Sequence, residues 1–425
     1  MLYYHLGYFV PRALKVADSR DLGKGYSFGD DFYQIWLTSR ESLHHRRDPY
    51  SPEMTREIQI GLYGRPLDPH RPRDPLDRRA FPYPAFVDLL FWPTANVPFP
   101  LVRVLVVCVL VPLTVATVLL WLKALSWRLR WPWVIIILLL VLCSYPVLEG
   151  FYAGQVGLLV GFLLGASIFV LRRGRLFLSG ILLALTTIKP QVTLLAILYL
   201  LLWSSHDWRK RGRLYVGFFS TLFLLVSSSL LVWRHWIQSW VHNAVEYHGY
   251  TMPPLVSAVL AVVLGPRVAG PFSFALNLSL LVAATVLAWR NRSAPAESAE
   301  FWLTLSLLLA ITTVILLPGQ AVYDHGILLP GILLIASRRR ELSQGSVLKA
   351  LLAMGMAVLL WPWIASFALI AFHPLLPQPR IYSNAAFALP LRTAAVFPFV
   401  VLGLLALALR ARSQQQHLLF ASPPH

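Results

Sequence analysis

Residues 101–122 read LVRVLVVCVLVPLTVATVLLWL, an apolar run with a single charge, at Arg103. A helix of this length can span a bilayer, whose hydrocarbon core needs about 20 predominantly apolar residues. Similar runs recur to the end of the chain, which is 57% hydrophobic and only 13% charged. Soluble domains carry about 25% charged residues. The sequence therefore predicts an all-α polytopic integral membrane protein. This composition excludes an ordinary soluble enzyme and a disordered chain. It also excludes a disulfide scaffold, because Cys108 and Cys143 both lie in apolar runs.

Positive charge is concentrated in the membrane part of the chain. The net charge of +18 comes from 37 Lys and Arg against 19 Asp and Glu, and residues 1–100 hold 12 of the acidic residues but only 13 of the basic ones. The excess lies in the clusters Lys123/Arg128/Arg130, Arg172/Arg173/Arg175, Arg209/Lys210/Arg211/Arg213, Arg290/Arg292, Arg338/Arg339/Arg340 and Arg410/Arg412. The positive-inside rule explains these clusters without a nucleic-acid partner. It places them and the C-terminus on the cytoplasmic side of the membrane, which we expect to be a bacterial-type inner membrane.

Fixing the clusters on that side predicts about 11 membrane segments. The runs are 101–122, 131–148, 154–171, 176–203, 214–233, 271–289, 301–317, 322–337, 347–369 and 387–409. We expect 176–203 to form two short helices or a re-entrant pair that breaks at Pro190, since proline removes a helical hydrogen bond. Residues 1–100 are expected to form an outer-face loop region with interfacial helices, and residues 101–425 the transmembrane helical domain. Met1–Ala13 is too short to span, so we expect the sequence to begin within, or after, a first membrane helix.

Two adjacent carboxylates, Asp30 and Asp31, stand just outside the predicted membrane part and precede an aromatic stretch. Such a pair could act as a general base or bind a cation. An exposed helix N-cap is the plainer alternative, because Asp is favoured there. Tyr83, between two prolines, could form a rigid turn in the interfacial aromatic belt. Tryptophans at helical spacing between residues 233 and 240 predict an amphipathic helix lying in the membrane interface.

Polar residues also interrupt the apolar runs. Glu149 and Gln155 lie at the outer ends of two predicted spans, where Gln155 could donate to a sugar hydroxyl or satisfy backbone groups. Lys189 lies between long apolar stretches, and a cation at membrane depth is a functional candidate. Its ammonium, next to the helix-breaking Pro190, suits an anionic group such as phosphate. A snorkelling lysine and a buried pair with Glu149 are the alternatives.

Asp324 and His325 stand between two predicted outer helix ends. His325 could bind phosphate, shuttle a proton or hold a metal, although catalytic zinc requires three protein ligands. Arg380 is a second candidate for phosphate binding. HExxH, CxxC, a Walker loop and GxGxxG after a strand are absent from the sequence, so no metal, nucleotide or other cofactor is predicted.

Several short motifs follow one another in a characteristic order. They are Asp31-Phe32-Tyr33, Asp48-Pro49-Tyr50, Tyr83-Pro84, Gly154-Gln155-Val156, Gly180 through Lys189-Pro190, and Pro318 through His325 to Leu328-Leu329-Pro330. This ordered set resembles glycosyltransferase family 87 and covers most of residues 28–335. The resemblance implies the GT-C architecture, a bundle of many membrane helices with an active site on the outer face. It implies a mannosyltransferase with a polyprenyl-phosphate-mannose donor, and a catalytic carboxylate at Asp31 with Asp30 as the contender.

Residue chemistry and resemblance together predict the reaction. A hexose, mannose by the resemblance, passes with inversion from a polyprenyl-phosphate sugar to a lipid or glycan acceptor of the cell envelope. Asp31 is the expected general base, and Lys189, His325 and Arg380 are the expected ligands of the donor phosphate. The other expected substrate-binding residues are Tyr33, Tyr83, Glu149, Gln155, Gln191 and Asp324.

Three alternatives remain open. A secondary transporter also carries intramembrane charge and a broken helix, but its polar groups would lie at the membrane midplane. A non-enzymatic envelope assembly protein would use the outer loop as a docking surface, and an outer cavity without a carboxylate near Lys189 would favour it. A glycosyltransferase of the same architecture could use another sugar or a lipid oligosaccharide.

Overall fold

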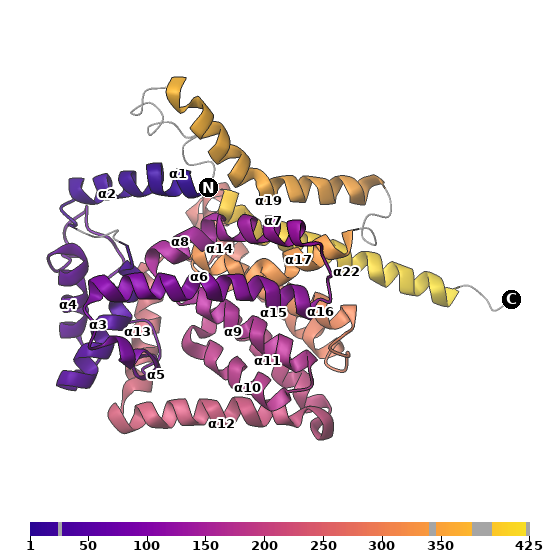
Figure 1. Ribbon diagram of the computed structural model, residues 1–425, viewed down its shortest axis with the longest axis horizontal. Helices are drawn as coiled ribbons and strands as arrows, with labels where there is room; N and C mark the ends of the chain where they lie inside the picture. Colours follow the sequence, from indigo (N-terminus) through magenta and orange to yellow (C-terminus); the bar gives the residue numbers. More distant parts are fainter. Residues whose placement is uncertain (24–27, 340–345, 376–392, 422–425) are drawn as a thin grey trace.

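Helices make up the regular structure of this computed structural model, which describes residues 1–23, 28–339, 346–375 and 393–421 (Figure 1). No strand occurs in those ranges, and their one isolated β-bridge joins Pro254 to Pro318. The first hundred residues contain α1 (Leu2–Tyr4), η1 (His5–Phe9), α2 (Val10–Ser19), α3 (Asp30–His45), α4 (Pro52–Tyr63), α5 (Phe86–Phe91) and η2 (Trp92–Thr94). The middle contains α6 (Phe99–Ala124), α7 (Trp131–Leu142), α8 (Tyr145–Ala153), α9 (Gly157–Arg172), α10 (Leu176–Leu185), η3 (Thr186–Ile188), α11 (Pro190–His206), α12 (Trp208–Val232) and α13 (Trp236–Tyr250). The last part contains α14 (Leu255–Leu264), α15 (Pro266–Arg290), α16 (Ala299–Ile315), η4 (Val322–Leu328), α17 (Leu329–Ser337), α19 (Ser346–Phe372), η5 (His373–Leu375), η7 (Thr393–Val396) and α22 (Phe397–Ala421).

Four of the described helices are long and apolar enough to cross a membrane: α6, α12, α15 and most of α19. A fifth span is possible if α7 and α8, which are bent by 57° at their break, form one crossing. The all-α membrane fold is thus confirmed, whereas the expected count of about 11 segments stays a prediction. The other apolar helical stretches are 10–17 residues long, with α22 counted only from Phe397 to Arg410. At 1.5 Å per residue, a helix of that length falls short of a hydrocarbon core of about 30 Å.

The expected break inside residues 176–203 is confirmed. Helix α10 ends in the 3₁₀ turn η3, Lys189 leaves the helical region at φ −135° and ψ 75°, and Pro190 opens α11. A proline at the first helical position needs no amide partner, and it disfavours the α conformation in the residue before it. The side chain of Lys189 is therefore held at a fixed helix junction.

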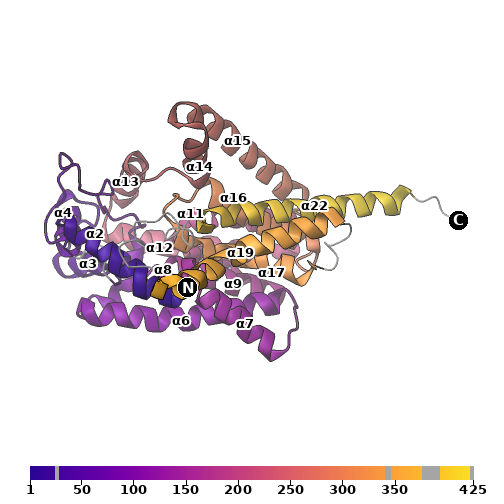
Figure 2. The same ribbon diagram turned by 90° about the horizontal axis from the view of Figure 1, so that it is seen from above.

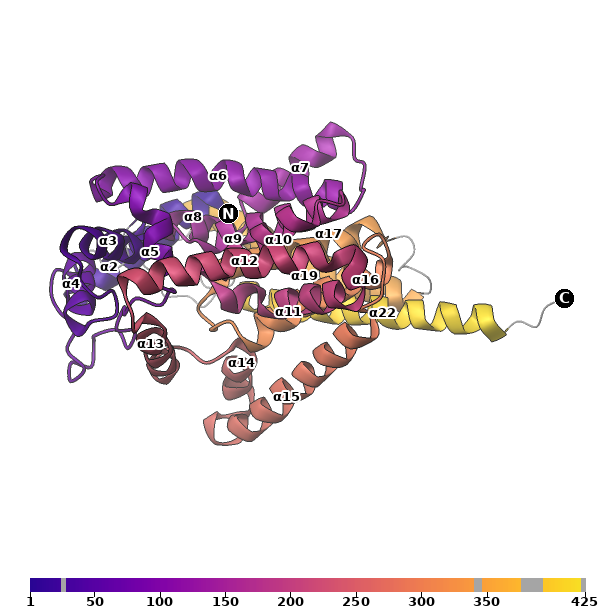
Figure 3. The same ribbon diagram turned by 90° about the horizontal axis from the view of Figure 1, so that it is seen from below.

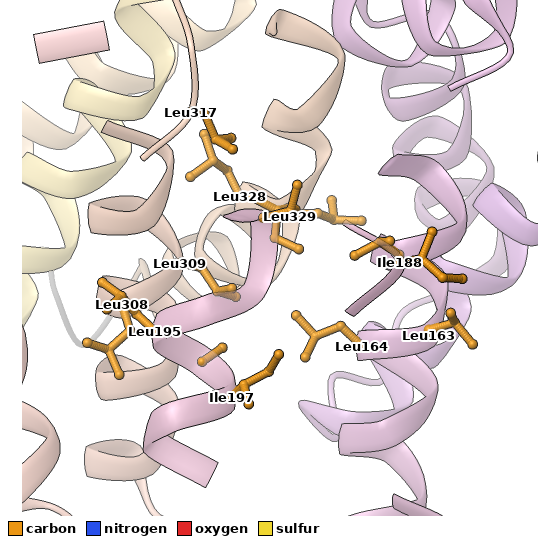
Figure 4. Close-up of a cluster of buried hydrophobic side chains, with 14 of the residues drawn as sticks. Leu163, Leu164, Ile188, Leu195, Ile197, Leu308, Leu309, Leu317, Leu328 and Leu329 are labelled. Atoms are coloured by element: carbon orange, nitrogen blue, oxygen red, sulfur yellow. The ribbon is translucent and has the colours of Figure 1, made fainter. Parts of the chain in front are cut away.

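Close helix approach and a buried central helix hold the bundle together. Gly180 and Gly217 lie where α10 crosses α12, and a Cβ on Gly180 would meet the backbone of Leu214. Small residues allow such approach between membrane helices. Every residue of α16 except Glu300 is buried. Figure 4 shows apolar side chains of α9, α11, α16 and the segment around η4 gathered in one buried cluster.

The two ends of the bundle carry different structures. One end, where α6 begins, holds the helices α3, α4, α5 and α13 (Figures 1 and 3). The opposite end holds the C-terminal ends of α6 and α22 and the loops that precede α12 and α16. There Arg211 donates to the carbonyls of Arg292 (3.2 Å) and Ser293 (3.2 Å), tying two of the basic loops together. Figure 2 shows α14 and α15 diverging from the remaining helices. The expected division into an outer-face region, 1–100, and a transmembrane domain, 101–425, stays a prediction.

Candidate functional site

A cavity of about 640 Å³ opens between the first hundred residues and the bundle. It brings together most of the polar residues that the sequence singled out: Asp30, Asp31, Tyr83, Glu149, Gln155, Lys189, Gln191 and Asp324. A larger groove of about 1040 Å³ between α15, α16 and α22 is mostly apolar and holds none of them. We take the smaller cavity as the candidate site, because convergent polar and ionisable groups identify a site better than volume does.

The two carboxylates stand on the first turn of α3. Gly29 is the N-cap, at φ 83°, and its amide donates to the carbonyl of Tyr152 at 2.7 Å. A Cβ on Gly29 would press on Arg103 of α6, so a glycine is needed both for the backbone angle and for the contact. Neither aspartate is the exposed N-cap of the plainer interpretation. Asp30 is buried, with 3% of its surface exposed, and both side chains reach the cavity.

Arg79 binds both carboxylates. Its Nη1 donates to Asp31 Oδ1 at 2.7 Å, its Nη2 to Asp30 Oδ2 at 3.3 Å and its Nε to the hydroxyl of Tyr63 at 3.0 Å. Burial, and then the charge of Asp31, raises the pKa of Asp30 well above its ordinary value, against the opposing charge of Arg79. Burial and the neighbouring negative charge both favour the neutral form of the Asp30 carboxyl.

A chain of side chains connects Asp31 to the broken helix. Lys189 Nζ lies 2.7 Å from Asp324 Oδ2 and donates to Gln155 Oε1 at 3.1 Å. An ammonium has only donors, so it fixes the oxygen of the Gln155 amide toward itself. The Nε2 of Gln155 therefore faces the other way and donates to Asp31 Oδ2. The ring of Tyr323 also faces the ammonium, with Nζ 4.7 Å from its centroid.

Other expected residues lie elsewhere or pair differently. Tyr33 is outside the cavity lining and packs on Phe99, with ring centroids 4.9 Å apart. His325 is buried and does not line the cavity either. Glu149 lines it but lies 3.6 Å from His5 Nε2, so the alternative that paired Glu149 with Lys189 is wrong. Arg380 falls outside the described residues.

Sequence reasoning missed Arg79, whose left-handed backbone (φ 57°) turns it back toward α3. The only signal was its place in a run rich in Pro, Arg and Asp. It also assigned the tryptophan helix to the membrane interface, a placement that stays a prediction. In the structure Trp240 of α13 lines the cavity and donates to the carbonyl of Pro82 at 3.0 Å. Tyr247 of the same helix lines the cavity as well.

Within the described ranges no three His, Cys, Asp or Glu side chains converge closely enough to hold a metal ion. The sequence model of glycosyltransferase family 87 matches residues 81–318, more than half of the chain. That match extends from the Tyr83 turn to Pro318 and includes Gln155 and Lys189. None of the curated proteins and none of the solved structures compared with the chain matches it.

Proposed function

The chain belongs to glycosyltransferase family 87, and we propose that it transfers a hexose, specifically mannose, from a polyprenyl-phosphate donor to a lipid or glycan acceptor. Family membership makes it a glycosyltransferase and its apolar helices embed it in a membrane. The donor, the sugar, the acceptor and the outer-face orientation are our proposals. The orientation rests on the basic loops, which lie at the end of α6 opposite the cavity (Figure 1).

One observation carries the proposal: a carboxylate and an ammonium face the same cavity and are separated by a single amide. Asp31 and Lys189 both bond to Gln155, so their distance apart is set by that side chain. A base for the acceptor hydroxyl and a cation for the leaving phosphate are what glycosyl transfer from a lipid phosphate requires. The pairing of Lys189 with Asp324 keeps the buried ammonium compensated until phosphate arrives.

The proposed reaction is a single in-line displacement. The acceptor oxygen forms a bond to the anomeric carbon while the bond from that carbon to the phosphate oxygen breaks. The proton of the hydroxyl goes to Asp31, and the electron pair of the broken bond goes to the phosphate, which Lys189 stabilises. Attack opposite the leaving group inverts the anomeric centre. Arg79 orients Asp31 and adds a second cation to the cavity.

His325 and Arg380 were also expected to bind the phosphate. His325 is buried beside Asp324 and outside the cavity lining, so we now place the cationic role on Lys189 and Arg79. The proposal makes no use of Arg380. A cavity without a carboxylate near Lys189 would have favoured a non-enzymatic assembly protein, and Asp324 lies 2.7 Å from the Lys189 ammonium.

The test compares two isosteric variants in the purified full-length protein, reconstituted in nanodiscs with radiolabelled polyprenyl-phosphate mannose and an envelope lipid extract. Asp31→Asn removes the base, and we expect turnover to fall by about 10²–10⁴-fold. Asp30→Asn replaces a buried carboxyl whose neutral form is favoured, and turnover should stay within about tenfold of wild type. Near-full turnover in both variants would overturn the base assignment. No transfer from any lipid-phosphate sugar by the folded wild-type protein would overturn the donor class.

A further inference from the structure

A second pocket, of about 690 Å³, lies where α6 ends, between the loop that leads to α7 and the loop that leads from α9 to α10. Four cationic side chains line it: Lys123, Arg128, Arg172 and Arg173. No Asp or Glu is among its lining residues, which all lie in the described part of the chain. We propose that this pocket binds the headgroup phosphate of an anionic phospholipid.

Arg172 is held in a fixed position by hydrogen bonds, which distinguishes the pocket from a stretch of basic surface. Its Nη1 donates to the carbonyl of Ala124, at the end of α6, and to Ser126 Oγ at 3.3 Å. Its Nε is buried and has no acceptor within the described structure. The bonds from Nη1 fix the guanidinium in the pocket wall, and a phosphate oxygen is an acceptor that a guanidinium matches well. Arg173 is held over the ring of Phe169, 4.4 Å from its centroid.

The remaining lining favours a lipid over free phosphate. Leu119, Leu122 and Val134 give the pocket an apolar wall, and Trp131 stands 73% exposed at its mouth. Tryptophan at this position is typical of the membrane–water boundary. A site with cations at one side and apolar side chains at the other fits a headgroup together with the upper part of its acyl chains.

The pocket is separate from the candidate catalytic site. Helix α6 is a candidate span of 26 residues, about 39 Å long at 1.5 Å per residue, and the cavity lies near its first turn. The pocket at its last turn therefore lies on the opposite face of the membrane. The proposal does not depend on the sugar donor or on the identity of the base.

Basic loops also follow from the positive-inside rule alone, which needs no ligand. The two explanations differ in one respect. If lipid binding depends on the surface potential, every nearby cation contributes to the affinity, whereas in a pocket only the cations that line it contribute. Arg128 and Arg173 line the pocket, whereas Arg130 and Arg175 belong to the same two clusters and do not. All four side chains are exposed, so exchange to glutamine should not disturb folding.

The experiment is a lipid titration of the full-length protein in neutral detergent, read by native mass spectrometry. We expect wild type to retain one phosphatidylglycerol in preference to phosphatidylcholine. Arg128→Gln with Arg173→Gln should weaken phosphatidylglycerol binding by about 25-fold, from roughly fivefold per lost cation. The matched pair Arg130→Gln with Arg175→Gln should stay within about threefold of wild type.

Two results would overturn the proposal. Equal losses in the two double variants would mean that the clusters act only through their summed potential. Displacement of phosphatidylglycerol by inorganic phosphate at equal concentration would mean a free-anion site without lipid preference. Thermal melts of both double variants serve as the folding control, and their midpoints should match wild type in lipid-free detergent.

Discussion

The buried pair of Lys189 and Asp324 allows a structural role to be separated from a catalytic one. The two side chains are 8% and 0% exposed and lie 2.7 Å apart. Lys189→Met leaves the carboxylate of Asp324 buried without its cation, which should cost about 3–5 kcal/mol of stability. Adding Asp324→Asn removes the uncompensated charge, so the double variant should regain most of that loss. Thermal unfolding in detergent, followed for both single variants and the double variant, measures this directly.

The double variant should recover its stability but not its transfer activity. If Lys189 stabilises the leaving phosphate, the double variant still lacks that interaction. Its kcat should remain about 10²–10³-fold below wild type, the usual loss when one electrostatic partner of the transition state is removed. The assay is transfer from polyprenyl-phosphate mannose, with kcat and KM measured for the donor. A double variant that regains both its melting midpoint and kcat within tenfold of wild type would refute the reasoning and leave Lys189 a purely structural residue.

Two other predictions use the same preparations. A Cβ on Gly157 would press on the carboxylate of Asp324, so Gly157→Ala should reduce transfer at least tenfold and lower the melting midpoint, while Gly161→Ala, with open space around it, should do neither. The carboxyl of Asp88 accepts a hydrogen bond from Thr38 at 2.8 Å, and burial raises its pKa to about 8. Because the folded state binds this proton more tightly than the unfolded state, the stabilisation is complete below about pH 4 and is lost as pH rises toward 8, by about 1.4 kcal/mol for each unit between pH 5 and 7. Between pH 5 and 7, the melting midpoint should fall less steeply with rising pH in Asp88→Asn than in wild type. Equal slopes in the two proteins would contradict the raised pKa of Asp88.

The membrane class, the family and several cavity residues could be predicted without the structure. Apolar runs such as 101–122 can avoid water only in a bilayer or a protein core, and their length distinguishes the two. Pro190 favours a helix break, because the missing amide and the ring are local properties, although Pro112 lies inside the continuous helix α6. Gln155 and Lys189 were candidates because polar groups among apolar residues need a partner or a function.

What connects these residues was decided by tertiary structure. Arg79 reaches Asp31 and Asp30 across 48 and 49 positions of sequence, and its left-handed backbone is one that an arginine seldom adopts and that the sequence pattern does not predict. The choice of Asp324 over Glu149 as the partner of Lys189 depends on how η4 packs against the helix break, across 135 positions of sequence. Composition and periodicity determine which polar and charged side chains must be shielded from the lipid. Which groups then meet depends on long-range packing, since each buried charge pairs with whatever opposite charge the fold brings within a few ångströms.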